Sequence, residues 1–187
     1  MASELRVDRI VPTAGVPTGG GGGIVQVATT ADPARTAIGT VSIPGSNQWT
    51  DSAITCTITP KSTSNKILVS GFLTGEGNAV DHLFFWRVNR SISGGSATAL
   101  EGATGTSRNE VFGPFLEGAA SDNSSTLTSC AFSNYLDSPA TVSAVTYTFQ
   151  VVYNGAATFY VNRTVTDSDS YNFERSLSYI TCMEVSA

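Results

Sequence analysis

The chain has 187 residues, a formal net charge of −5 and a sequence pI near 4.7. This length suits one domain with its own hydrophobic core. The ten basic residues are scattered, which argues against binding to nucleic acid or to an anionic membrane, because both need clustered Lys and Arg. Charged residues make up only 13% of the chain, so the surface is expected to be polar mainly through hydroxyl and amide groups.

Residues 1–23 differ from the rest of the chain. Four apolar side chains, Leu5, Val7, Ile10 and Val11, lie within seven residues, and five consecutive glycines follow at 19–23. A run of glycines is flexible and belongs outside a packed element. We interpret this segment as an extended arm with a glycine-rich hinge that becomes ordered on a partner through the four apolar residues. The alternative is a disordered tail.

No membrane insertion is expected from this sequence. The first residues are polar and no apolar signal-peptide core follows them. No run of about 20 apolar residues, the length needed to cross a bilayer, is present.

Alternating apolar and polar residues, separated by clusters of Gly, Pro, Asn and Ser, predict strands and no helix. Eight or nine strands are predicted, and in chain order they are 24–28, 49–59, 66–74, 82–89, 127–136, 142–153, 157–163 and 177–185, with a possible short strand at 40–43 and a faint one at 97–101. The segment 111–115 carries apolar bulk without a clear strand pattern. Strands at this spacing are typical of an antiparallel sandwich. We therefore predict an all-β fold, an antiparallel jelly-roll-like β-sandwich over residues 24–187 that follows the extended N-terminal arm.

The predicted connections carry two specific expectations. Asn154-Gly155 is the dipeptide that a tight hairpin prefers, so strand 157–163 is expected to pair antiparallel with strand 142–153. The loops expected at 75–81, 91–109 and 118–125 are rich in small polar residues. They are the predicted place for receptor recognition, because loops on a rigid scaffold usually carry binding residues.

The segment 82–89, HLFFWRVN, is apolar on both faces of the predicted strand. A lone sandwich buries only one face of a strand, and burying a large apolar side chain contributes about 1.5–3 kcal/mol. We therefore predict a homotrimer in solution, with Phe84, Trp86 and Val88 as candidates for the oligomer interface.

The residues offer little for catalysis or metal binding. His82 is the single histidine, which excludes zinc sites with two or more His. A Ser-His-Asp triad through His82 lacks a Gly-x-Ser-x-Gly elbow, and a polar residue at a strand start is the simpler interpretation. Asp167 and Asp169 could help to hold a hard cation such as calcium, but a solvated loop is the alternative. No catalytic, cofactor or metal residue is assigned, and the protein is not expected to be an enzyme.

Three cysteines, Cys56, Cys130 and Cys182, are far apart in the sequence. A secreted disulfide scaffold would have more cysteines at closer spacing. The prediction is that all three are small buried hydrophobic residues with free thiols.

Both ends of the chain carry a family resemblance. At the N-terminus it rests on SELRVDRIVPT at 3–13, GVPT at 15–18 and the glycine run into IVQV at 24–27. At the C-terminus it rests on LDSP at 136–139, TY at 146–147, VNR at 161–163, TDSD at 166–169 and ITCMEV at 180–185. Together these segments resemble tail-fibre-like virion proteins of marine cyanophages and related phages. The middle of the chain, about 29–125, is similar only in its general residue types, most of all at ITPKSTSNKILV (58–69).

The resemblance implies a structural protein of the virion, assembled in the host cytoplasm, and no catalytic residues. It implies a homotrimeric tail-fibre or fibre-head knob. The partners expected are other copies of the chain, other virion proteins through residues 1–23, and a host-surface glycan. Two alternatives stay open: a capsid decoration or cement protein, and a carbohydrate-binding or depolymerising module.

Overall fold

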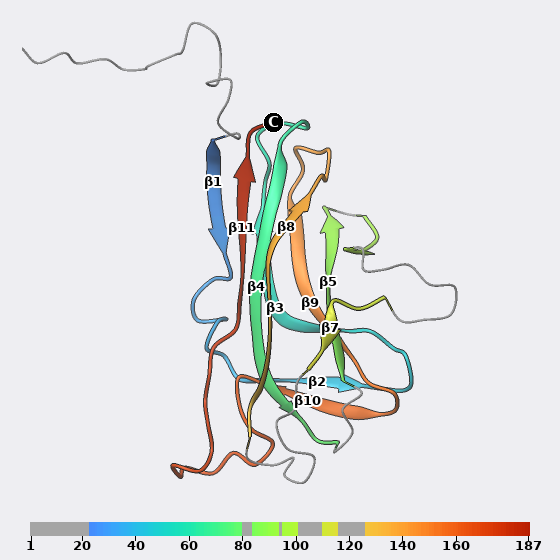
Figure 1. Ribbon diagram of the computed structural model, residues 1–187, viewed down its shortest axis with the longest axis vertical. Helices are drawn as coiled ribbons and strands as arrows, with labels where there is room; N and C mark the ends of the chain where they lie inside the picture. The colour runs from blue at the N-terminus through green and yellow to red at the C-terminus, as the bar shows by residue number, and fades with distance from the viewer. Residues whose placement is uncertain (1–22, 80–83, 94, 101–109, 116–125) are drawn as a thin grey trace, which may run out of the picture.

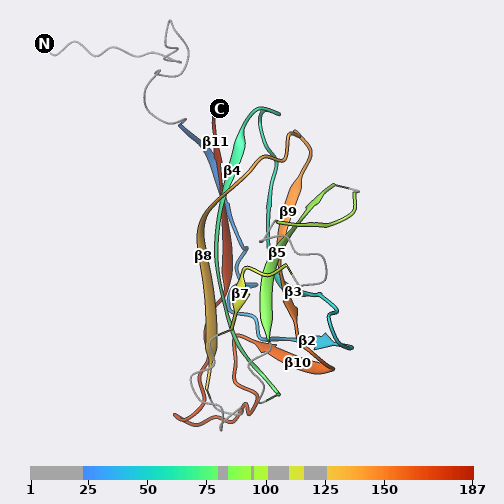
Figure 2. The same ribbon diagram turned by 45° about the vertical axis from the view of Figure 1, so that its right-hand side comes forward.

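The computed structural model describes residues 23–79, 84–93, 95–100, 110–115 and 126–187. Within them the chain has strands and no helix. The strands are β1 (Ile24–Thr29), β2 (Gly39–Ile43), β3 (Thr50–Ile58), β4 (Lys66–Gly77), β5 (Phe85–Ile92), β6 (Thr98–Ala99), β7 (Gly113–Pro114), β8 (Thr128–Asp137), β9 (Val145–Val152), β10 (Ala157–Val161) and β11 (Tyr179–Val185). They form two antiparallel sheets that face each other (Figures 1 and 2).

The strands pair as a nested set, which is the pattern of a jelly roll. β1 pairs with β11, β3 with β9, β4 with β8, and β5 with the short β6 and β7. Sheet A contains β1, β11, β4 and β8, and sheet B contains β3, β9, β5, β6 and β7. Successive nested pairs thus alternate between the two sheets, as in a double-sheet jelly roll. The prediction of an all-β, antiparallel, jelly-roll-like sandwich is confirmed.

Two further strands extend sheet A at one end. β10 pairs with the last residues of β4 on one side and with β2 on the other. β2 and β10 cross the lower end of the molecule in Figure 1, where β4 bends toward them. The predicted arm lies outside the described residues, except for Gly23.

The core lies between the two sheets and follows the alternation of the sequence. Ile54, Cys56 and Ile58 of β3 are at most 3% exposed. Large aromatic side chains fill the centre of the core, namely Phe84, Tyr147, Phe149 and Phe159. All three cysteines are buried with free thiols, so that prediction is confirmed.

The prediction of a hairpin at Asn154-Gly155 is wrong. β9 pairs with β3 and β5 in sheet B, whereas β10 pairs with β2 and β4 in sheet A. The backbone at Asn154 is not among the positive-φ residues that a type I′ turn requires. The turn instead carries the chain from one sheet to the other, which alternation within a strand cannot reveal.

The predicted start of the loop at 75–81 is wrong, because β4 continues to Gly77. Gly75, Glu76 and Gly77 are all buried. The Glu76 carboxylate accepts a hydrogen bond from the Val165 amide at 2.6 Å. Two glycines in three residues gave no apolar alternation, so the sequence pattern ended too early.

The interface assigned to Phe84, Trp86 and Val88 is also wrong. Their side chains are 1%, 5% and 0% exposed and belong to the chain's own core. The Phe84 ring packs against Phe159, with centroids 6.1 Å apart. The second sheet of the same chain therefore covers this apolar face, and no partner is needed to bury it.

Candidate functional site

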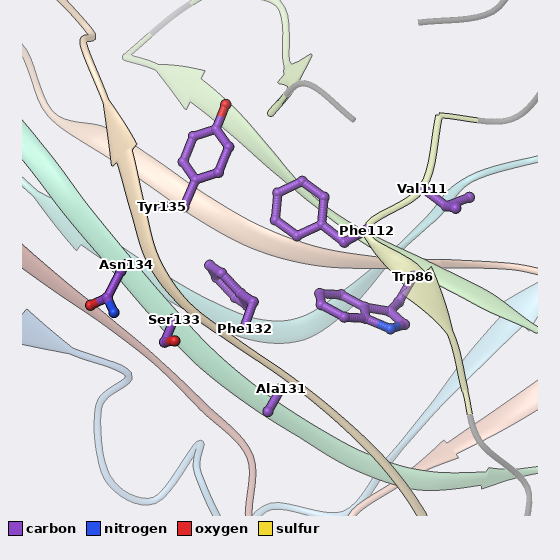
Figure 3. A pocket seen from close by; sticks show the side chains of 8 residues that line it. All are labelled: Trp86, Val111, Phe112, Ala131, Phe132, Ser133, Asn134 and Tyr135. Atoms are coloured by element: carbon purple, nitrogen blue, oxygen red, sulfur yellow. The ribbon is translucent and has the colours of Figure 1, made fainter. Parts of the chain in front are cut away.

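A groove of about 410 Å³ opens at one side of the sandwich (Figure 3). It lies between β8, which pairs only with β4 among the described strands, and the β5–β7 pair of sheet B. Its lining residues are Trp86, Val111, Phe112, Ala131, Phe132, Ser133, Asn134 and Tyr135. The groove therefore joins the edges of both sheets.

Four aromatic rings form the wall of the groove. Phe112 lies at their centre, 5.5 Å from Trp86, 5.5 Å from Phe132 and 5.6 Å from Tyr135 between ring centroids. Figure 3 shows the Phe112 ring between those of Tyr135 and Trp86. Trp86 is almost fully buried, whereas the other three rings are partly exposed. The wall is thus anchored in the core and reaches the surface.

A β-bulge in β8 shapes the groove. Phe132 pairs with Gly71 and Tyr135 with Val69, so β8 has one residue more than β4 across this step. Asn134 has a φ of 61° there, and its backbone amide donates to the Ser70 hydroxyl at 3.2 Å. Residues three apart on a regular strand face opposite sides. The bulge brings Phe132 and Tyr135 to the same side, and it leaves Ser133 and Asn134 exposed at the rim.

The chemistry of the groove suits an uncharged ring-shaped ligand. Aromatic faces pack on the apolar face of a sugar ring, and the hydroxyl and amide groups of Ser133 and Asn134 can hydrogen-bond its hydroxyls. None of the eight lining residues is Asp, Glu, His, Lys or Arg. The arrangement can bind such a ligand, and it offers no acid–base pair.

Sequence reasoning missed this groove. The sequence pattern predicts Trp86 at an oligomer interface and assigns no binding role to Phe112, Phe132 or Tyr135. The available signal was the aromatic pair three residues apart in β8, which fits no regular strand. Without the bulge and the β7 neighbour, that spacing could not be interpreted.

Most of the other predicted site residues cannot be compared with the groove. Leu5, Val7, Ile10, Val11 and His82 are outside the described residues, as are most of 91–109 and all of 118–125.

Asp167, one of the two candidate calcium ligands, forms ion pairs with two arginines. Arg175 Nη2 lies 2.6 Å from Asp167 Oδ1, and Arg163 Nη1 lies 4.0 Å from Asp167 Oδ2. Asp169 is exposed. Among the described residues no group of three or more His, Cys, Asp or Glu is placed to hold a metal ion. The Asp167 carboxylate therefore serves as a partner of two guanidinium groups.

Buried polar groups in the described ranges are paired inside the protein. Every buried side-chain nitrogen or oxygen there has a hydrogen-bond partner. Glu184, for example, accepts from Gln26 Nε2, the Lys61 amide and Asn65 Nδ2 at 2.5, 2.7 and 2.6 Å. Burial favours a higher pKa for Glu184, but these donors outweigh it and hold the pKa below its ordinary value. This carboxylate ties β1 and β11 to the 59–65 turn and has a structural role.

No protein-family model matches the sequence, and no curated protein matches it either. The described part of the chain contains no helix that is long and apolar enough to span a membrane.

Proposed function

We propose that this chain is a non-enzymatic structural subunit of a phage virion, a homotrimeric tail-fibre or fibre-head component that attaches through residues 1–23. The observation that carries the proposal is the resemblance of both chain ends to tail-fibre-like virion proteins. The fold supports it, since jelly rolls recur in viral and lectin domains. A fold alone does not fix a function.

The arrangement of the resembling segments adds support. Residues 24–27 and 180–185, from opposite ends of the chain, lie in β1 and β11, which are neighbours in sheet A. None of the eight groove residues belongs to a resembling segment: three lie in the middle of the chain, and 131–135 come just before the C-terminal segments. This arrangement suits subunits that share a scaffold and meet different hosts.

The role of residues 1–23 in attachment to the particle is tested by removing them. We expect a chain that lacks residues 1–23 to keep its melting temperature but to be absent from purified virions. Replacing Leu5, Val7, Ile10 and Val11 by serine should have the same effect, because these residues are the proposed anchors. Replacing Gly20 and Gly22 by serine is the matched control, since a Gly/Ser linker stays flexible.

Antibody labelling of whole particles decides between tail and head. Label at the tail supports the proposal, and label over the head lattice indicates a decoration protein. Normal incorporation of the truncated chain would show that the anchor lies elsewhere.

Carbohydrate binding is a second candidate function, favoured by the aromatic groove. We expect the protein to bind neutral glycans from the host surface on an array. Replacing Tyr135 by alanine should weaken this binding by about tenfold or more, since an aromatic contact contributes about 0.5–1.5 kcal/mol beyond its buried area. Tyr171→Ala is the control, because Tyr171 is 97% exposed and far from the groove in sequence. Equal binding by both variants would exclude the groove.

A further inference from the structure

The outer face of sheet A carries an apolar row that crosses four strands. Val27 of β1 pairs with Met183 of β11, Met183 with Leu68 of β4, and Leu68 with Leu136 of β8. Figure 1 shows β1, β11 and β4 side by side. Val27 and Leu136, at the two ends, are 58% and 53% exposed. Four strands about 4.8 Å apart make this row roughly 14 Å wide.

The outer face of sheet B shows the opposite chemistry. The row that crosses its three main strands is Arg87, Gln150 and Asp51. Arg87 Nε donates to Gln150 Oε1 at 2.7 Å, and Gln150 Nε2 donates to Asp51 Oδ1 at 2.6 Å. Arg87 also stacks on the Trp49 ring at 4.1 Å. This row of sheet B is thus polar, as a solvated sandwich face normally is, whereas the row from Val27 to Leu136 on sheet A is apolar.

The uncovered part of the outer face of sheet A carries no acidic group on its four strands. Its exposed or half-buried outward residues on the four strands are Ile24, Val25, Val27, Thr29, Lys66, Leu68, Ser70, Phe72, Ser129, Ala131, Ser133, Asn134, Leu136, Tyr179, Thr181, Met183 and Val185. Among these only Lys66 is charged, and its ammonium donates to the Ser138 hydroxyl at 2.8 Å. Thr74 and Glu76 of β4 also face outward but are buried, and the Glu76 carboxylate accepts from the Val165 amide. The chain has 15 acidic residues and a net charge of −5, so copies repel each other over most surfaces. On this face two copies can meet without opposed carboxylates.

We propose that the outer face of sheet A binds another copy of this chain, with the β1 end of one apolar row against the β8 end of the next. In this contact Val27 of one copy lies beside Leu136 of its neighbour. Such end-to-end contacts close into a ring when three copies turn this face toward a common axis. The inference rests on the self-association in the proposed function, and it assigns that association to residues other than Phe84, Trp86 and Val88.

The first test is Leu136→Glu, measured by analytical ultracentrifugation. The wild type is expected to be a trimer at micromolar concentration. The variant should associate at least about 100-fold more weakly, because an apolar interface would bury an unpaired carboxylate. Val142→Glu is the control. Val142 is 54% exposed, close to the value for Leu136, but lies in the connection between β8 and β9. Both variants should keep the wild-type circular dichroism spectrum.

The second test joins the two ends of the row. The double variant Val27→Cys, Leu136→Cys is treated with a short bismaleimide, which cross-links nearby thiols. The native cysteines are buried and act as an internal control. We expect a covalent trimer from the double variant and no cross-link from either single variant.

The outcomes separate the two proposals. A covalent dimer would support this face and overturn the trimer. A wild type that is monomeric would overturn self-association and the interface together. A trimer that survives Leu136→Glu and does not cross-link would overturn the face alone and leave the proposed function standing.

Discussion

Replacing Gly75 by alanine is expected to lower the free energy of unfolding by about 3 kcal/mol or more, because a side chain there has no space. A Cβ atom at Gly75 would overlap the Tyr160 carbonyl oxygen and lie 2.6 Å from the Phe159 ring. The carbonyl belongs to the paired β10 strand and cannot rotate away. The melting temperature should fall by roughly 6–12 °C, measured by calorimetry.

The matched control is Gly39→Ala on the other side of β10. Val161 pairs with both Gly75 and Gly39, so the two glycines occupy equivalent positions on either side of β10. The nearest atom to a Cβ at Gly39 is 4.0 Å away. This variant should melt within a few degrees of the wild type. A loss of stability as large as that of Gly75→Ala would contradict the steric explanation.

Replacing Asp137 by alanine is expected to lower the free energy of unfolding by about 2–3 kcal/mol, because it leaves a buried hydroxyl and a guanidinium that is only 23% exposed without their acceptor. Asp137 Oδ1 accepts from Arg90 Nη1, and Oδ2 accepts from the Tyr147 hydroxyl, both at 2.7 Å. Asp137 belongs to sheet A, and both donors belong to sheet B. Urea denaturation should show the loss as a lower midpoint with an unchanged slope.

The Asp137 prediction has a control of the same chemistry. Arg35 Nη2 and Asp32 Oδ2 form an ion pair of the same 2.7 Å length on the surface. Because exposed ion pairs contribute little, Asp32→Ala should leave the midpoint nearly unchanged. Tyr147→Phe should have an intermediate effect of about 1 kcal/mol, the usual net contribution of one hydrogen bond. Equal effects of Asp137→Ala and Asp32→Ala would show that burial of the Arg90–Asp137 pair is unimportant.

Burial of Tyr147, followed by its hydrogen bond to Asp137, raises the pKa of the phenol far above its ordinary value. The phenol therefore stays protonated, and remains a donor, at pH values where an exposed tyrosine ionises. The connection between the sheets does not depend on titration of this residue.

The candidate site was less predictable than the fold. Trp86 was recognised as important because its segment is apolar on both faces, but the sequence could not tell a neighbouring sheet from a neighbouring subunit. Both would bury the same side chain. The groove depends on Phe112, which reaches β8 through the short β7, and on a bulge at Ser133 and Asn134. Neither feature has a regular period in the sequence.

The alternation of apolar and polar residues is enough to predict the all-β class, the approximate position of each main strand and inward residues such as Ile54 and Cys56. Alternation with a period of two carries that information because it reports which side chains of one strand share a face. Which strands are neighbours becomes known only from the folded chain. The fold separates β9 from β10 and aligns Val27, Met183, Leu68 and Leu136, which are far apart in the chain, into one exposed row. The pairing of strands depends on how the two sheets close over a shared core. It is therefore a property of the whole fold and of no single segment.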